Sequence, residues 1–257
     1  MTILEIKKLT RNFKGLTALC RIDIEVREGE ILGVIGPNGA GKTTLFNVIS
    51  GYLKPSSGEI LFRGENIVGV KPYDIVKKGI ARSFQGASLF QDTSCLENLI
   101  IAHHLYKKFG FWQAILKTKA YALREEEVKG KSMKMLENIN LAEKKGACTH
   151  EIPYGHQKMI GIEMALSTNA ELLLLDEPVS GMNPEEALAV TKIIEQIRSK
   201  NGITVIVVEH NMKVVMKICN RIVVIDHGEK IAEGSPEAIR SNRKVIEAYL
   251  GAEEIQE

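Results

Sequence analysis

Residues 36 to 43 read Gly36-Pro37-Asn38-Gly39-Ala40-Gly41-Lys42-Thr43, and this stretch decides the fold. It matches the whole of the phosphate-binding pattern G-x-x-x-x-G-K-[ST]. The apolar run Ile31 to Ile35 before it predicts a buried strand, and residues 44 to 50 after it predict a helix that ends at Gly51. In this context the backbone N–H groups of the loop and the helix N-terminus converge on phosphate oxygens. The sequence therefore predicts a protein that binds a nucleoside triphosphate.

The loop also predicts individual roles. We expect Lys42 to reach the β- and γ-phosphates and Thr43 to ligate Mg²⁺. The spacing differs from the dinucleotide fingerprint G-x-G-x-x-G, which excludes a nicotinamide or flavin role. The residues expected to contact ATP here are Gly36, Pro37, Asn38, Gly39, Ala40, Gly41, Lys42, Thr43 and Thr44.

The amino-acid composition limits the classes of protein to which the chain can belong. The chain has 257 residues, of which 44% are hydrophobic, so it can bury a large core without disulfide bonds. Its 34 basic and 32 acidic residues are well mixed, which gives no support to a nucleic-acid partner. The cysteines at 20, 95, 148 and 219 show no metal-ligand spacing and indicate free thiols in a reducing compartment. No apolar run approaches the roughly 18 to 20 residues of a membrane span, and the N-terminus lacks a signal-peptide pattern. We therefore expect a cytoplasmic chain that meets a membrane only through a partner.

The order of elements predicts an α/β fold of the P-loop NTPase class, with a mixed sheet and an inserted helical subdomain. Short β-rich runs at 4–9, 22–26, 31–35 and 59–62 alternate with turn signals, whereas helical periodicity dominates from about 86 to 165, for example over 124–141. Strands at 171–175 and 204–208, separated by a helix at 184–200, predict a parallel βαβ crossover. Terminal helices are expected over 236–250. We therefore expect a nucleotide-binding core formed by 1–85 and 166–257 and a helical subdomain formed by 86–165.

Two acidic residues follow the apolar run Leu172 to Leu175. Asp176 is expected at the carboxyl end of a central strand, where it would hold Mg²⁺ directly or through water. Glu177 would polarise a water for attack on the γ-phosphate. An isolated Asp-Glu pair after a strand is more often a helix cap or a solvated turn. A phosphate loop on the same chain favours the metal and general-base roles.

Further motifs in this order resemble the ATP-binding cassette (ABC) ATPases over the whole chain. They are Pro153-Tyr154-Gly155-His156-Gln157, then Asp176-Glu177, then Ser180-Gly181-Met182-Asn183-Pro184, and finally His210 after a strand. The resemblance implies a signature motif, Tyr154, Gly155, His156 and Gln157, that contacts ATP bound on a second subunit.

The same resemblance implies roles for three isolated residues. His210 would contact the γ-phosphate and act with Glu177 and Lys42 in catalysis, Gln85 would ligate Mg²⁺, and Phe13 would stack on adenine. Taken alone, a Phe after a strand is more often core, and a lone His or Gln is more often surface.

The signature departs from the commonest form of the family, Leu-Ser-Gly-Gly-Gln. Tyr154 stands in place of the serine, so the serine hydroxyl that would contact the γ-phosphate is absent here. The helix N-terminus at Gly155 would still bind phosphate through its backbone. The Tyr-Gly pair, the stretch at 181–184, the long helical insert with Phe111-Trp112 and the ending Val245 to Gly251 resemble the ATPases of branched-chain amino-acid importers.

This resemblance implies partners and a location. It implies ATP and Mg²⁺, a second ABC ATPase subunit, integral-membrane permease subunits that grip residues 86–97, and, indirectly, an extracytoplasmic solute-binding protein. The chain would lie peripherally on the inner face of the cell membrane. Import of urea, amides or another polar solute, a soluble ABC ATPase without a permease, and a small-molecule kinase are the alternatives.

Overall fold

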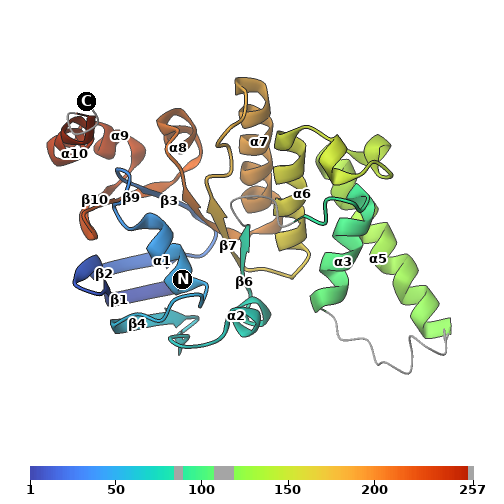
Figure 1. Ribbon diagram of the computed structural model, residues 1–257, viewed down its shortest axis with the longest axis horizontal. Coiled ribbons are helices and arrows are strands. Elements are labelled where there is room, and N and C mark those ends of the chain that lie inside the picture. The colour runs from blue at the N-terminus through green and yellow to red at the C-terminus, as the bar shows by residue number, and fades with distance from the viewer. Residues whose placement is uncertain (84–88, 107–118, 254–257) are drawn as a thin grey trace. The chain divides into compact units, whose positions relative to one another are not determined.

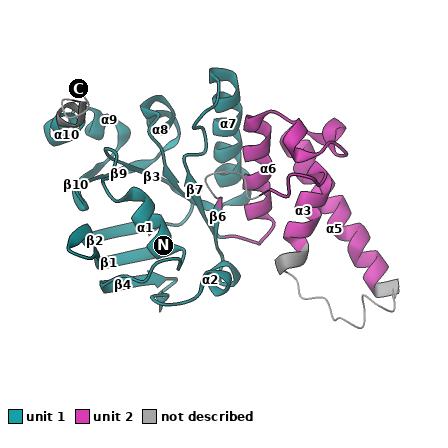
Figure 2. Ribbon diagram, viewed as in Figure 1, with its two compact units in different colours: residues 1–82, 171–257 teal, residues 83–170 magenta. Residues whose placement is uncertain are grey.

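The computed structural model describes residues 1–83, 89–106 and 119–253, and it divides into two compact units. Unit 1 comprises Met1–Arg82 and Glu171–Glu257, and unit 2 comprises Ser83–Ala170 (Figure 2). Gln85 and Phe111-Trp112 lie outside the described residues.

Unit 1 contains two sheets and the helices that pack on them (Figure 1). Its strands are β1 Thr2–Phe13, β2 Leu16–Arg27, β3 Ile31–Ile35, β4 Ser57–Phe62, β5 Glu65–Asn66, β6 Ile80–Ser83, β7 Leu172–Asp176, β8 Thr204–Val208, β9 Arg221–Asp226 and β10 Glu229–Gly234. Its helices are α1 Lys42–Ile49, α2 Pro72–Lys78, α7 Pro184–Asn201, α8 Met212–Ile218, α9 Pro236–Arg240 and α10 Arg243–Glu253.

The six-stranded sheet is mixed, as the sequence predicts, and has the order β10-β9-β3-β8-β7-β6. Strand β3 pairs in parallel with β8 and β9, while β10 runs antiparallel to β9. The predicted crossover is confirmed, because α7 connects β7 to β8 and these strands pair in parallel. The carboxyl ends of β3, β7 and β8 therefore lie at one edge of this sheet, where α/β proteins bind ligands.

The four-stranded antiparallel sheet, of order β2-β1-β4-β5, is a separate layer. The sequence predicts the mixed sheet, but it does not distinguish this second sheet from it. Strands β1 and β2 are 12 residues each, much longer than the predicted runs, and their pairing shifts register at several points. These shifts break the simple alternation of apolar and polar residues, which is why the sequence pattern shows only the regular part of each strand.

Helix α1 packs into the core shared by both sheets. Its side chains Leu45, Phe46 and Ile49 are fully buried and belong to one apolar cluster with Leu4 of β1 and Val208 of β8. Since α1 begins at the phosphate loop, the packing that fixes this helix also fixes the loop.

Unit 2 is helical, with α3 Cys95–Tyr106, α5 Lys119–Asn138, α6 Tyr154–Leu166 and the short 3-10 turns η1 Ala142–Lys144 and η2 Thr149–Glu151. Helix α3 packs against both α5 and α6. The predicted helix at 124–141 is present, but it begins at Lys119 and ends at Asn138. In the part of the chain that the structure describes, no helix is both long and apolar enough to cross a membrane.

Candidate nucleotide site

The phosphate loop connects β3 to α1, and two of its glycines are required by close approach of other strands. A Cβ atom at Gly36 would lie 1.9 Å from the carbonyl oxygen of Ile225 in β9. At Gly41 it would lie 2.5 Å from the carbonyl oxygen of Ala18 in β2, and the φ angle of 105° there favours glycine. The loop is therefore held between strands of both sheets, with no room for side chains at these points.

The other loop residues divide by exposure. Asn38, Gly39 and Thr43 are exposed, Pro37 and Thr44 are half-buried, and Ala40 is buried. The hydroxyl-bearing residues Thr43 and Thr44 lie in the first turn of α1, whose backbone N–H groups have no carbonyl partner inside the helix. The loop thus presents amides and a hydroxyl to a phosphate, as the sequence predicts for this motif.

Lys42 is held inside the loop. Its Nζ donates hydrogen bonds to the carbonyl oxygens of Gly36 and Pro37, both at 2.7 Å, and only 6% of the residue is exposed. Burial lowers the pKa of the Lys42 ammonium, and the charges of Glu177 and Asp176 oppose that effect. The structure therefore brings both carboxylates, 134 or more residues away in sequence, into electrostatic reach of Lys42.

Asp176 lies at the end of β7 and is bound by an arginine. Arg82 donates from Nη2 to Asp176 Oδ2 at 2.7 Å, and from Nη1 to Asn47 Oδ1 at 2.7 Å and Ser50 Oγ at 3.3 Å. The two charged side chains are 8% and 2% exposed. Because one carboxylate oxygen is engaged by Arg82, Asp176 is better placed to hold a cation through water than by direct bidentate coordination.

Glu177 and His210 face each other across the carboxyl ends of β7 and β8. Glu177 Oε1 lies 2.8 Å from His210 Nε2, and the backbone N–H of Glu177 donates to Val208 O at 2.9 Å. The φ angle of Glu177 is 47°, a left-handed conformation that is uncommon for a residue with a side chain. In this conformation the carboxylate lies next to the His210 ring, so the predicted base and the predicted γ-phosphate contact form one pair.

Glu209 is part of this site and was missed by the sequence analysis. The carboxylate is 2% exposed and accepts hydrogen bonds from the backbone N–H groups of Val179 at 2.8 Å, His210 at 3.0 Å and Asn211 at 3.2 Å. It ties the loop after β7 to the loop after β8. A glutamate next to the noted His210 was the signal available, but its partners are defined only by the fold.

Arg82 and Asn47 were missed for the same reason. Arg82 lies three residues before Gln85, yet nothing in the local pattern pairs it with a residue 94 positions away. Asn47 falls on the face of α1 that points to Arg82. A buried strand end carrying an aspartate is a signal that some cation must lie nearby.

Phe13 ends β1 and is 38% exposed. The guanidinium of Arg11 lies 4.4 Å from the centroid of its ring. One face of the ring thus carries a cation, and the ring is not part of the core.

The signature residues begin α6 in unit 2. Tyr154 is 43% exposed with the ammonium of Lys158 5.2 Å from its ring centroid, while Gly155 is buried. His156 and Gln157 are half-buried, and Gln157 Nε2 donates to Ile152 O at 3.0 Å. The first turn of this 13-residue helix contains no acidic side chain that would oppose an anion.

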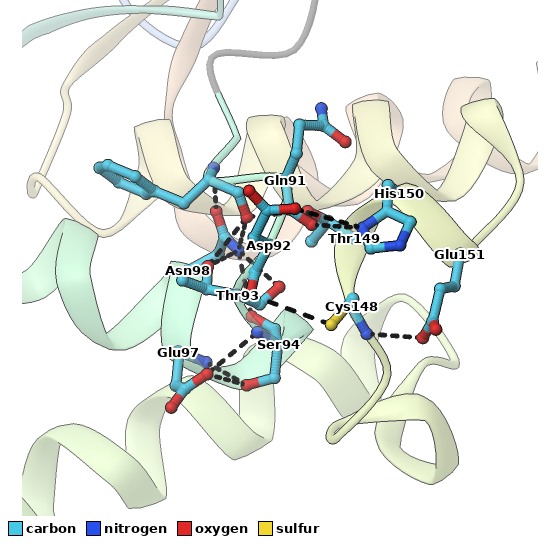
Figure 3. A network of polar contacts seen from close by, with 11 residues as sticks. Gln91, Asp92, Thr93, Ser94, Glu97, Asn98, Cys148, Thr149, His150 and Glu151 are labelled. Carbon is cyan, nitrogen blue, oxygen red and sulfur yellow. Dashed lines mark hydrogen bonds and ion pairs between the residues drawn. The ribbon is translucent and has the colours of Figure 1, made fainter.

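A polar network in unit 2 fixes the loop that precedes α3 (Figure 3). Asn98 is fully buried, and its Nδ2 donates to Phe90 O at 3.1 Å, Thr93 Oγ1 at 2.8 Å and Ser94 O at 3.0 Å, while its Oδ1 accepts from Phe90 N at 2.8 Å. Thr149 Oγ1 donates to the same Phe90 carbonyl at 3.0 Å. The buried side chains of Asn98 and Thr149 therefore hold the inner side of this loop.

The outer side of this loop is exposed. The Phe90 residue is 46% exposed and the Asp92 side chain is fully exposed. His150 Nδ1 lies 2.9 Å from Gln91 O. A rigid loop therefore presents an aromatic ring and a carboxylate to solvent, in the second half of the stretch 86–97, of which residues 86–88 lie outside the described part.

Comparisons with known proteins agree with this geometry. A family profile described as "ABC transporter" matches residues 19–180, and one described as "Branched-chain amino acid ATP-binding cassette transporter" matches residues 229–255. The high-affinity branched-chain amino acid transport ATP-binding protein BraF of Pseudomonas aeruginosa is 40% identical, over 97% of this chain and 98% of that protein. LivG of Escherichia coli, a protein of the same description, is 38% identical over the same shares. The crystal structure of MJ1267, an ATP-binding cassette of an ABC transporter in its ADP conformation, gives a TM-score of 0.85 at 31% identity, covering 98% of this chain and 99% of that one.

Proposed function

Because this chain belongs to the ATP-binding proteins of ABC transporters, we propose that it hydrolyses ATP to energise the import of leucine, isoleucine and valine. The observation that carries the proposal is the Glu177–His210 pair, 2.8 Å apart, within electrostatic reach of the buried phosphate-loop Lys42. The substrate class rests on the likeness to relatives described as branched-chain amino acid transport proteins.

Each residue of the pair has a distinct role. Glu177 orients and polarises the attacking water, and His210 contacts the γ-phosphate while holding the glutamate carboxylate in place. Lys42 binds the β- and γ-phosphates once its hydrogen bonds to the loop carbonyls exchange for phosphate oxygens. Its charge stabilises the transition state in a site that excludes most water.

The oxygen donors at the loop fit Mg²⁺. Thr43 offers an exposed hydroxyl in the first turn of α1, and Asp176 offers a carboxylate at the end of the neighbouring β7. Hard oxygen ligands with several retained waters are typical of this ion. We assign the direct contact to Thr43 and Gln85 and the water-mediated contact to Asp176. When bound, the ion neutralises charge on the β- and γ-phosphates.

The signature motif serves a second subunit. The α6 N-terminus, with the backbone at Gly155 and the side chains of Tyr154, His156 and Gln157, binds the γ-phosphate of ATP held on the partner's phosphate loop. ATP then joins two cassettes, and hydrolysis releases them. Phe13 ends β1 outside the core, and this position supports its stacking on adenine. The ring face that stacks is the one opposite Arg11.

The membrane partners follow from this cycle. Permease subunits dock on the exposed side of residues 90–97, and closure of the ATPase dimer is transmitted to them through that rigid loop. An extracytoplasmic solute-binding protein delivers the amino acid to the permease. The chain is thereby held at the cytoplasmic face of the membrane.

The test is uptake by the purified transporter complex in proteoliposomes loaded with ATP and Mg²⁺. Radiolabelled leucine, isoleucine and valine should accumulate, and urea and acetamide should not. The Lys42→Ala variant should lose ATP hydrolysis and uptake together, by about 100-fold or more. Uptake of urea instead would overturn the substrate class, whereas hydrolysis by a folded Lys42→Ala protein at the original rate would overturn the site.

A further inference from the structure

An apolar groove lies in unit 1 between α8, α9 and α10, and none of the residues that line it is assigned to ATP. Its volume is about 510 Å³, within the range of small-molecule sites. The apolar walls come from Met212, Met216, Ile239, Val245 and Ile246. Two of these are methionines, whose flexible side chains adapt to aliphatic ligands of varied shape.

Two basic side chains also line the groove. Lys213 of α8 and Arg240 at the end of α9 are both exposed, and within the described residues neither makes an ion pair. The basic residues nearby that do have partners, such as Arg243 with Glu247, lie outside the lining. No acidic side chain of the described residues lines the groove.

Tyr249 of α10 supplies its ring to the same wall. Burial raises the pKa of its hydroxyl, which the backbone of Gly36 partly opposes, so the phenol is neutral at physiological pH. The charge of the groove is therefore positive and comes from Lys213 and Arg240.

We propose that this groove binds a small aliphatic monocarboxylate, with the chain along the walls formed by Met212, Met216 and Ile246 and the carboxylate between Lys213 and Arg240. A volume of about 510 Å³ is large enough for an aliphatic chain of medium length together with its headgroup. The walls supply hydrophobic burial and the two cations supply selection for an anion. The proposal rests on the residues that line the groove and does not depend on the proposed transport function.

The first test is the dependence of affinity on chain length. Isothermal titration of the full-length protein with hexanoate, octanoate and decanoate should give an affinity that rises about threefold to fourfold for each added methylene. Octanol, which lacks the charge, should bind more weakly than octanoate. Equal affinity for octanol and octanoate would overturn the role of the cations.

The second test removes the charges. Lys213→Ala and Arg240→Ala should each weaken octanoate binding about two- to fivefold, as expected for exposed ion pairs. Lys217→Ala is the matched control, because it removes the same charge from the same helix outside the groove. A loss of affinity in Lys217→Ala equal to that in Lys213→Ala would show a general field effect and overturn the site.

The third test blocks the groove without disturbing the core. Ile246 is 45% exposed, so Ile246→Glu should fold and should abolish octanoate binding. Unchanged binding in a folded Ile246→Glu protein would place the ligand elsewhere. Binding of octanoate only after deletion of residues 254–257 would mean that the end of the chain fills the groove and would also overturn the proposal.

Discussion

Glu177 occupies a left-handed backbone conformation, with a φ angle of 47°. Such a conformation costs about 1 kcal/mol or more for a residue with a side chain, and it persists only where the surroundings demand it. In this conformation the Glu177 carboxylate lies 2.8 Å from His210 Nε2. The unfavourable backbone conformation of Glu177 therefore accompanies a contact that its side chain makes with His210.

The Glu177→Gln variant keeps the shape of this side chain and its hydrogen bonding but removes the carboxylate that activates water. We expect ATP to bind normally and hydrolysis to fall, so that the ATP-bound dimer persists. Light scattering after incubation with ATP should report a dimer, and with ADP a monomer. Glu185→Gln, in the exposed first turn of α7, is the matched control and should behave as the unchanged protein. A monomer with ATP bound would indicate an ATPase that works alone.

The Arg82–Asp176 pair predicts an unequal effect of single and double substitutions. Arg82→Met leaves the Asp176 carboxylate buried and unpaired, which should lower the free energy of unfolding by about 3 to 5 kcal/mol in urea titrations. Removing both charges with Arg82→Met and Asp176→Leu should recover a large part of that loss. Arg243→Met, which breaks a pair whose arginine side chain is 91% exposed, should cost less than about 1 kcal/mol. Equal losses for the two arginines would mean that the buried pair is solvated.

The roles of residues could be predicted from the sequence where the residues that act together are close to one another in the chain. The loop at 36–43 can be identified because glycine, lysine and threonine act within eight consecutive positions. The partners of Asp176 and the contacts of Glu209 could not be predicted, because each depends on a residue brought close only by strand order.

At the scale of the elements, helix α6 contains a buried acidic residue that does not stabilise the fold. Glu163 is 5% exposed, and burial raises its pKa to about 7. Below about pH 4 the carboxyl is protonated in both folded and unfolded chains and costs nothing. As the pH rises toward 7, the unfolded chain ionises first, so stability falls by up to about 3 kcal/mol and then stays constant.

Glu163→Gln should therefore raise the free energy of unfolding at pH 8 and leave it nearly unchanged at pH 4. Chemical denaturation at a series of pH values between these limits measures the difference. Glu137→Gln, on the exposed side of α5, serves as the control and should show no such pH dependence. A stabilisation by Glu163→Gln that is the same at pH 4 and pH 8 would exclude ionisation as its cause.

Elements were predictable where one pattern defines them. Helix α7 begins at Pro184 with Asn183 as its N-cap and Glu186 completing a capping box, so its start could be read from four residues. The separation of the strands into two sheets could not be predicted, because the pairing of β1 with β4 joins segments that are distant in the sequence. Register shifts in β1 further hid the length of that strand.

At the scale of the whole molecule, transport depends on contact with a permease. The double variant Phe90→Ala and Asp92→Arg changes the exposed side of residues 90–97. It should reduce amino-acid uptake about tenfold or more, because residues at the centre of an interface carry most of the binding energy. The affinity for ATP should stay unchanged. Leu123→Ala on α5, which is 72% exposed, is the control and should leave uptake intact. Uptake and ATPase rates measured in the same proteoliposomes separate the two effects. Full uptake in the double variant would move the docking surface away from residues 90–97.

The Glu209 carboxylate has a consequence for the slow motions of the protein. One carboxylate accepts the amide protons of Val179, His210 and Asn211, so loss of the Glu209 side chain from its position would expose all three amides together. Hydrogen–deuterium exchange should give the three amides similar protection factors, and Glu209→Gln should lower all three while leaving the protection of the strand β8 amides unchanged. In that case the loops that follow β7 and β8 move as one unit, because the same side chain anchors both.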